Sequence, residues 1–239
     1  MEQSIILSYL EQNGAESINS AFLAFLSSLE TIARVAPEVS RSIVQELADQ
    51  RSSLKLIASE NYSSLASQLA MGNLLTDKYA EGYAYHRFYA GCDNVDAVED
   101  MAVEEAKKLF GCDHAYVQPH SGADANLVAY WAILSTRIEM PRLNSLQAKN
   151  TNELSDADWA SLRHDMGNQR LLGLDYYSGG HLTHGYRMNV SSRMFDAHSY
   201  TVSRETGLID YDMIESKARE LKPLILLAGY SAYPRAINF

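Results

Sequence analysis

The sequence predicts an α/β fold with a largely parallel sheet. Apolar runs at 171–174 and 224–228 lack polar alternation, which is typical of strands buried on both faces. Helical patterns precede and separate such runs, and this alternation indicates parallel strands joined by helices. With 46% apolar residues among 239, the chain has enough material for a substantial core. Only about three strands are convincing, against about five to six in a usual sheet. We therefore expect helices on both faces of an incomplete sheet.

Residues 1–52 predict a helical arm that precedes this sheet. Apolar side chains recur every three or four positions in 17–36, as in an amphipathic helix. Pro37 ends that helix and suits the first position of the next, whose apolar face includes Val39 and Ile43. A coiled-coil dimerisation segment is the alternative, but no heptad repeat is sustained.

The remaining residues, 53–239, are assigned to one partial large domain. It begins with a strand or extended stretch at 54–58, a helix through Leu65 and Leu74, and a loop at 79–91. Asp93 or Asn94 is expected to cap the next helix, which ends at Gly111.

The later elements follow the strand–helix pattern. They are a strand at 114–117, a helix at about 121–135, a strand at 171–174, a helix at 210–221 capped by Asp210, and a strand at 224–228. The polar stretch at about 139–170 is expected to be an exposed insertion, because loops above about 12–15 residues are uncommon without function or disorder.

Composition narrows the classes of partner and compartment. The net charge of −10 argues against a nucleic-acid partner, which would need a basic face. No run reaches the roughly 18 apolar residues of a membrane span. The first basic residue is Arg34, so neither a secretory nor a mitochondrial leader is expected. Cys92 and Cys112 form no C-x-x-C pair, and a reducing, cytoplasmic setting fits best.

The segment Gln118-Pro-His-Ser-Gly-Ala-Asp-Ala-Asn126 links a predicted strand to a predicted helix. Ser121 can cap that helix, and Gly122 lets backbone N–H groups approach a ligand. The unpaired donors and the helix dipole suit a phosphate. No G-x-G-x-x-G or Walker motif supports a nucleotide. An ordinary capped helix is the alternative.

The segment Gly179-Gly-His-Leu-Thr-His-Gly185 places two histidines between glycines. His181 and His184 have the spacing of a zinc pair, but no further ligand stands at a metal-like spacing, so no metal site is predicted. A histidine ring here can lie against a planar cofactor. A histidine bonded to the backbone of a tight loop is the alternative.

Two further segments combine polar and aromatic residues. In the stretch Tyr79–Tyr89, aromatic neighbours are expected to desolvate Glu81, which raises a carboxyl pKa and suits it to proton transfer. The alternative is an aromatic cluster with a solvated carboxylate. In Leu56–Tyr62, Ser59 follows an apolar run, and ligands of α/β proteins bind at the carboxyl ends of strands. A helix cap is the alternative there.

Taken together and in this order, these segments resemble the serine hydroxymethyltransferase family from about Pro37 to Phe239. The matching strings are RSSLKLIASENY, TDKYAEGYAYHRFYAGCDNVD, QPHSGADAN, GGHLTHG and SAYPRAINF. The resemblance implies a fold-type-I enzyme dependent on pyridoxal 5'-phosphate. Such an enzyme converts serine and tetrahydrofolate to glycine and 5,10-methylenetetrahydrofolate, and works as a homodimer with shared active sites. A threonine aldolase-like enzyme is disfavoured by GGHLTHG together with YAEGY.

The resemblance also implies roles for individual residues. Ser121, Gly122, Tyr79 and Ser231 would bind the cofactor, and His181 would stack on its ring as one of two catalytic residues. Glu81 would be the other, handling protons in the partner's site. Ser59, Glu81 and Tyr89 would bind the amino-acid substrate. Tyr176, Gly180, His181 and Leu182 would lie along the folate.

The chain departs from the family pattern at several positions. Ala84-Tyr85-His86 stands where Pro-Gly-Lys is common, so the loop backbone is expected to differ, and Phe88 lacks a pocket hydroxyl. Tyr176-Tyr177 replaces a Leu-Ser-like pair, and Asn238 replaces an Asp. The stretch 139–170 is longer than in most members.

The family's Schiff-base lysine and pyridine-nitrogen aspartate motifs do not occur in this sequence and would lie beyond Phe239. We therefore expect this chain to be the N-terminal part of the enzyme and to be inactive on its own. The alternative is a truncated non-catalytic paralogue that binds the cofactor weakly or pairs with a full-length subunit.

Overall fold

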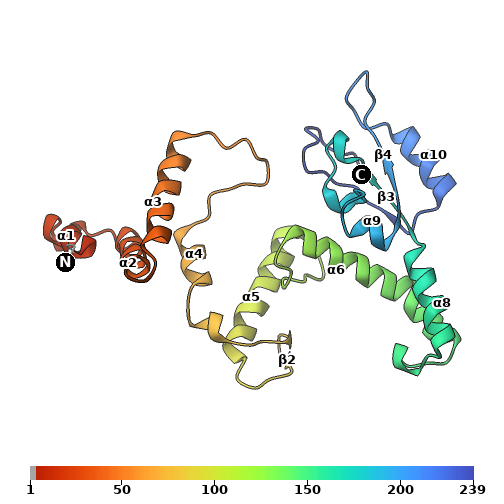
Figure 1. Cartoon of the computed structure of the whole chain (residues 1–239), viewed down its shortest axis with the longest axis horizontal. Coiled ribbons are helices and arrows are strands. Elements are labelled where there is room, and N and C mark those ends of the chain that lie inside the picture. Colours follow the sequence, from red (N-terminus) through yellow and green to blue (C-terminus); the bar gives the residue numbers. More distant parts are fainter. Residues whose placement is uncertain (1–3) are drawn as a thin grey trace. The chain divides into compact units, whose positions relative to one another are not determined.

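The computed structural model describes residues 4–239 (Figure 1). The chain divides into two compact units, Met1–Asp100 and Met101–Phe239, which are described separately below. This division falls later than the predicted boundary after residue 52. The assignment of 53–100 to the large domain therefore rests on the resemblance alone.

The first unit begins with the helices α1 (Ile5–Gln12), α2 (Ser20–Val35) and α3 (Pro37–Ser52). Helices α2 and α3 confirm the predicted helical pair, and Pro37 starts α3 as expected. Helix α1 was not predicted. It is joined to α2 because the Ser4 hydroxyl donates to Glu30 Oε2 at 2.7 Å and the ring of Tyr9 packs edge-on against Phe22.

After α3 the backbone runs through 54–64 without forming a strand, so only the extended alternative for 54–58 holds. The side chains of Leu54 and Leu56 are more than nine-tenths exposed. Without a neighbouring strand, this segment cannot form the backbone hydrogen bonds of a sheet. Helix α4 (Leu65–Met71) and the 3₁₀ turn η2 (Leu74–Asp77) follow.

The predicted loop 79–91 contains a small antiparallel hairpin of β1 (Gly82–Tyr83) and β2 (His86–Arg87). Its two-residue connection places Tyr85 in the left-handed region, at φ 62°. That conformation favours glycine, the residue that is common here in the family that this sequence resembles.

Helix α5 (Asp93–Phe110) comes next. Asp93 and Asn94 lie within its first turn, so the prediction that one of them caps the helix is wrong. Acidic side chains there still complement the helix dipole. Gly111 follows the helix at φ 62°, which confirms the predicted helix-terminating glycine.

The second unit is built around a three-stranded parallel sheet in the order β4-β3-β5, as the sequence predicted for this fold class. The strands are β3 (Arg170–Leu174), β4 (Asp196–Tyr200) and β5 (Ile225–Leu226). The predicted strand at 114–117 is wrong, because this segment pairs with no strand in the described chain. Strand β4 was missed, since its sequence Asp-Ala-His-Ser-Tyr carries no apolar run.

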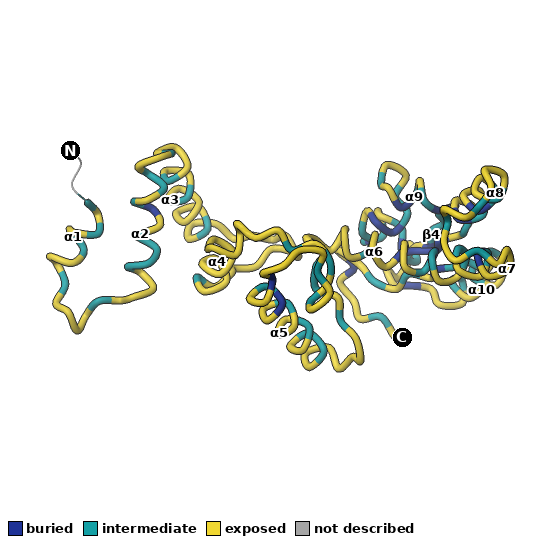
Figure 2. Tube along the Cα trace, turned by 90° about the horizontal axis from the view of Figure 1, so that it is seen from below, coloured by how far each residue is buried: buried dark blue, intermediate teal, exposed yellow. Residues whose placement is uncertain are grey.

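Helices cover both faces of this sheet. On one face, α6 (Gly122–Leu134) and α8 (Asp156–Gly167) pack Leu134 and Leu162 against Leu171. On the other, Leu172 and Tyr200 pack against α10 (Tyr211–Leu221), which Asp210 caps as predicted. Leu171 and Leu172 serve opposite faces because successive side chains of a strand alternate. Figure 2 shows the buried residues gathered around β4.

The prediction that 139–170 is an exposed loop is wrong. It contains α7 (Met140–Ser145), the 3₁₀ turn η4 (Thr151–Glu153) and α8, and it buries Leu143, Leu162 and Met166. These few apolar residues anchor the helices although the segment is polar overall. Between α6 and α7 lies η3 (Ser135–Glu139), one turn of π-helix, in which the Met140 N–H donates to the Ser135 carbonyl.

Candidate functional site

The N-terminus of α6 is the predicted anion site. The Ser121 hydroxyl accepts from the Asp124 N–H at 3.1 Å, which confirms the predicted cap. A Cβ built on Gly122 would meet nothing within 4 Å, so the start of the helix is open on that side. The first N–H groups of a helix lack partners within the helix, and here the Asp124 N–H is bonded to the Ser121 hydroxyl.

The Gly179–Gly185 segment forms a tight loop between β3 and the short helix α9 (Ser191–Met194), with the 3₁₀ turns η5 (Tyr176–Ser178) and η6 (Leu182–His184). His181 is half-buried, and its Nδ1 accepts from the Thr183 N–H at 3.2 Å. His184 Nδ1 accepts from the His181 N–H at 3.3 Å. Burial, with a smaller contribution from charge on His181, lowers the pKa of His184 to about 4.

Two hydrogen bonds join α6 to this loop. The Asn126 Nδ2 group donates to Thr183 Oγ1 at 2.7 Å, and the Tyr130 hydroxyl donates to the Thr183 carbonyl at 2.7 Å. Burial raises the pKa of Tyr130. Because Asn126 lies little more than one turn after Ser121, the predicted anion site and the histidine loop belong to one local arrangement.

The segment that carries Ser231 packs against the double glycine. The N–H groups of Ser231 and Ala232 donate to the Gly179 carbonyl at 2.8 and 2.9 Å. A Cβ on Gly179 would lie 2.6 Å from the Tyr233 nitrogen, and one on Gly180 would overlap the Leu174 carbonyl. Only glycine fits at both positions, and this close approach brings the Ser231 segment to the His181 loop.

A cavity of about 200 Å³ opens beside the histidine loop. Its lining includes Asp175, Tyr176, His181, His184 and Tyr186. The rings of Tyr176 and Tyr186 lie 4.9 Å apart. Of the four predicted folate contacts, Tyr176 and His181 line this cavity, whereas Gly180 and Leu182 do not. The predicted cofactor residues Ser121 and Ser231 do not line it either.

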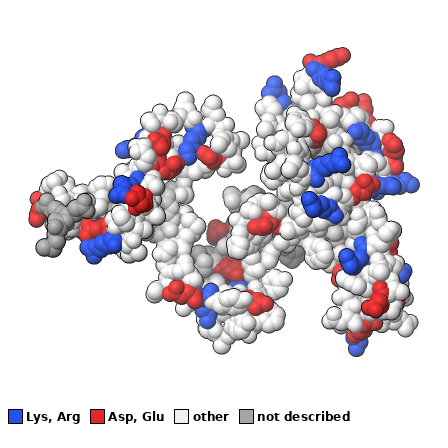
Figure 3. Space-filling view, in the orientation of Figure 1, with Lys and Arg blue, Asp and Glu red and all other residues white. Residues whose placement is uncertain are grey.

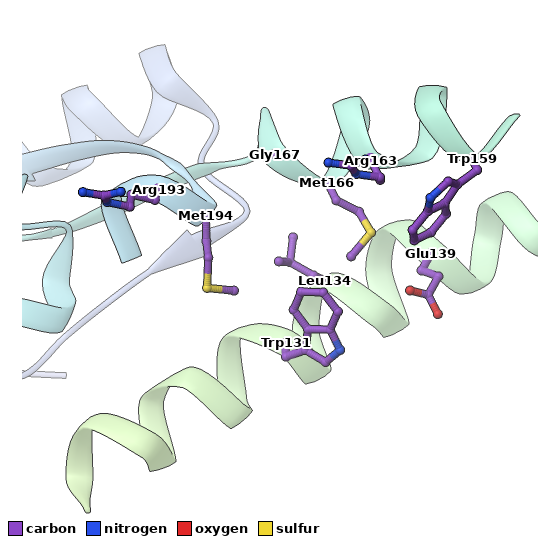
Figure 4. Close-up of a pocket in the computed structure, with 9 residues that line it drawn as sticks. All are labelled: Trp131, Leu134, Glu139, Trp159, Arg163, Met166, Gly167, Arg193 and Met194. Carbon is purple, nitrogen blue, oxygen red and sulfur yellow. The ribbon is translucent and has the colours of Figure 1, made fainter. Parts of the chain in front are cut away.

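A second cavity in this unit, of about 260 Å³, is lined by residues of α6, η3, α8 and α9 (Figure 4). Its apolar walls include Trp131, Trp159 and Met166, and no residue of the predicted site lines it. This cavity was not predicted, because Trp159 lies in the stretch that was expected to be an exposed insertion.

The remaining predicted site residues lie in the first unit. Tyr79 and Tyr89 flank the β1–β2 hairpin, and their rings pack edge-on at 5.3 Å. Glu81 is exposed, so its predicted desolvation by aromatic neighbours is wrong for this chain, since those rings pack on each other. Ser59 lies in a turn that follows the extended stretch, and with Lys55 it lines a polar cavity of about 310 Å³.

Arg87 holds this hairpin in place. Its guanidinium donates to Asp96 Oδ1 and Glu99 Oε2, each at 2.7 Å, and to the carbonyls of Ala80 and Gly82. Its side chain is only 4% exposed, and the carboxylates of Glu99 and Asp96 raise its pKa. Sequence reasoning missed Arg87, as it missed Asn126 and Thr183. The sequence signal for Arg87 was a basic residue followed by Asp96 and Glu99, two acidic residues spaced as on one face of a helix.

The described residues form neither a metal-binding cluster nor a membrane-spanning helix. No group of three or more His, Cys, Asp or Glu side chains in residues 4–239 is arranged to hold a metal ion. None of the helices in that range is long and apolar enough to cross a membrane. Figure 3 shows acidic and basic side chains interspersed on the visible face of the second unit.

Comparison with known proteins gives a consistent result. The family model for serine hydroxymethyltransferase matches residues 32–156 and 162–239. A serine hydroxymethyltransferase from Treponema pallidum is 62% identical over 239 residues, which is all of this chain and 42% of the relative. One from Mycolicibacterium smegmatis is 58% identical over 95% of the chain and 46% of the relative. One from Chlamydia trachomatis serovar D is 50% identical over 92% and 45%.

The chain thus spans less than half the length of these curated relatives. The family model nevertheless extends over both units from residue 32 onward. It includes nearly all of the helical segment 139–170, in which only residues 157–161 are unmatched. On this evidence the chain belongs to the serine hydroxymethyltransferase family.

Proposed function

We propose that the chain is the N-terminal part of a cytoplasmic, pyridoxal-phosphate-dependent serine hydroxymethyltransferase. In the complete enzyme it would help to move the hydroxymethyl carbon of serine to tetrahydrofolate, giving glycine and 5,10-methylenetetrahydrofolate. The observation that carries the proposal is the pair of hydrogen bonds from Asn126 and Tyr130 to Thr183, which unites an open helix N-terminus with the histidine loop.

The residues of the second unit fit the cofactor. Ser121 and Gly122 would bind its phosphate, because the first amides of the helix and its dipole favour an anion and the space beside Gly122 is open. The His181 ring, held through Nδ1, would lie against the pyridine ring, with Ser231 on the neighbouring segment. When bound, pyridoxal phosphate supplies an electron sink for bond cleavage next to the amino group of the substrate.

The same unit would contact the folate. Tyr176 lies beside His181 in one cavity, and Gly180 and Leu182 flank that histidine in the chain. Aromatic faces at Tyr176 suit a planar ring system better than the aliphatic side chain that is common there in the family.

The first unit would supply residues to the site of a partner subunit in a homodimer. Tyr79 would reach the cofactor phosphate, Ser59 and Tyr89 the amino acid, and Glu81 would take or give a proton on the substrate. The exposure of Glu81 and its neighbours supports this role, because residues that act on a second copy must project from their own. Burial against that copy would then desolvate Glu81.

We further propose that the chain alone does not turn over serine. None of its seven lysines stands in the family's cofactor-binding motif, and Lys217, for example, is committed to the Ser199 carbonyl at 2.8 Å. The rival possibility, a non-catalytic paralogue, makes a different prediction in the experiment that follows.

The test is complementation. The chain is co-purified with the remaining C-terminal portion of the Treponema pallidum relative, and serine cleavage is measured with tetrahydrofolate. We expect activity from the pair and none from either part alone. A chain with Glu81→Gln serves as control, with assembly retained and activity lost. A pair that assembles, binds pyridoxal phosphate and stays inactive would identify the non-catalytic paralogue instead.

A further inference from the structure

Thr183 is only 3% exposed, and all of its polar groups form hydrogen bonds. Its carbonyl accepts from Tyr130, its N–H donates to His181 Nδ1, and its hydroxyl lies between Asn126 and His181. The hydroxyl oxygen is 2.7 Å from Asn126 Nδ2 and 2.8 Å from His181 Nδ1. Thr183 therefore connects helix α6 to the histidine ring through a continuous chain of hydrogen bonds.

The direction of each bond follows from its donor. A backbone N–H can only donate, so His181 Nδ1 must present a lone pair to Thr183. The Asn126 amide also donates, so it occupies a lone pair of the Thr183 oxygen. The hydroxyl proton is then directed at His181 Nδ1. Two donors converge on one ring nitrogen, and in a neutral imidazole the proton must sit on the other nitrogen, Nε2.

We propose that Asn126 is a positioning residue that, through the Thr183 hydroxyl, fixes His181 in the tautomer with its proton on Nε2. Helix α6 would thus determine the tautomer of His181 as well as the position of the histidine loop. The tautomer follows from the hydrogen bonds alone.

Its consequence for catalysis rests on the proposed function. The Nε2 position would offer a hydrogen-bond donor to an oxygen of the cofactor or substrate. A neutral ring with its proton already on Nε2 cannot take a proton there, so His181 would not be the base of the reaction. That role would remain with Glu81.

The test reads the tautomer directly. Two-dimensional ¹H–¹⁵N spectra of the histidine side chains are recorded on the full chain at neutral pH without cofactor, with His181→Gln to assign the signals. We expect the His181 pattern of a neutral ring protonated at Nε2. A pattern of Nδ1 protonation, or of two tautomers in fast exchange, would overturn the proposal.

Two substitutions at Asn126 distinguish an effect of hydrogen-bond direction from an effect of packing. An ionised Asp in Asn126→Asp can only accept, so the Thr183 hydroxyl would turn toward it and withdraw one donor from His181. We expect the fraction of His181 with a proton on Nδ1 to rise on the order of tenfold. Asn126→Leu removes the donor that directs the hydroxyl but offers no acceptor in its place, so the Nδ1-protonated fraction should rise less than in Asn126→Asp. Equal effects, or no effect, from the two substitutions would contradict the proposal.

Tyr130→Phe is the matched control, because it removes the bond to the Thr183 carbonyl and leaves the hydroxyl bonds intact. It should not change the tautomer. If circular dichroism shows that Asn126→Asp does not fold, Thr183→Val removes the same donor and should raise the Nδ1-protonated fraction; an unchanged fraction would overturn the proposal. The spectra need no cofactor, so a failure here is distinct from failed complementation.

Discussion

The two units of the chain are stabilised in different ways. The second buries apolar residues on both faces of a parallel sheet, with Leu162, Leu171 and Leu172 fully enclosed. In the first, buried apolar side chains are few among the described residues, and Leu29 is one of them. Its hairpin is held by Arg87 and the carboxylates of Asp96 and Glu99. Figure 2 shows the contrast in exposure along the chain.

This difference indicates a division of tasks. A sheet covered on both faces is a rigid base for Ser121 and His181, the residues that we propose to bind the cofactor. A hairpin fixed by ion pairs can keep its shape while Tyr79 and Glu81 project outward. The substitutions below test this contrast, from the largest expected effect to the smallest.

Leu162→Ala tests the apolar base. Leu162 is 0% exposed, and its truncation leaves a cavity against the sheet, so the free energy of unfolding should fall by about 2 to 5 kcal/mol. Denaturant titration followed by circular dichroism measures it. Leu56→Ala, at a side chain that is 93% exposed, is the control and should change little. Equal losses would remove the contrast between the units.

His184 tests the polar part of the second unit. Its pKa of about 4 in the folded chain lies below its ordinary value of 6.5, so the unfolded chain binds the proton more tightly. Stability should be complete above pH 6.5 and fall between pH 6.5 and 4, by up to about 3 kcal/mol. The measurement is denaturant titration at several pH values.

The control for this pH dependence is His184→Asn, whose side-chain oxygen can replace Nδ1 as the acceptor from the His181 N–H. It should reduce the slope of stability between pH 6.5 and 4. An unchanged slope would show that other groups cause it.

Arg87→Met tests the ionic clamp in the first unit. It leaves the buried Asp96 carboxylate without its cation and frees the hairpin from two carbonyl contacts. Cleavage within 79–91 by a limiting amount of protease should accelerate on the order of tenfold. Arg87→Lys is the matched control; one ammonium group cannot reproduce the forked contacts, so it should restore only part of the protection.

Tyr85→Gly tests the turn at the hairpin's tip. Tyr85 lies at φ 62°, where glycine has no steric penalty, so the substitution should stabilise the hairpin by about 1 kcal/mol or less. Hydrogen exchange of the Phe88 N–H, which donates to the Glu81 carbonyl, measures the local change. Ala84→Gly, at a position without positive φ, should not produce the gain.

Local signals in the sequence predicted local structure well. Pro37 at the start of α3, Ser121 and Asp210 as caps, and Gly111 after α5 are all confirmed, because each acts within one helical turn. The apolar run 171–174 became the central strand, since its side chains can be buried on both faces.

What the sequence did not reveal depends on distant contacts. Strand β4 forms because its backbone pairs with β3, and no side-chain pattern in Asp196–Tyr200 indicates a strand. The segment 114–117 has a strand-like sequence but no pairing partner in the described residues. Within the site, the link between Asn126 and Thr183 joins positions 57 residues apart. Single-sequence reasoning located both motifs, but it could not establish that they bond to each other.

The π turn η3 has one further consequence. A π turn holds one residue more than an α turn, and α7 follows this one from Met140. Deleting a single residue from 135–139 would convert it to an α turn and leave the helix after it in its present rotational phase. The same deletion within the regular helix α6 would rotate everything after it by about 100° about the helix axis and turn Leu143 out of its buried position. The π turn is therefore the place between α6 and α7 where the loss of one residue should be tolerated best.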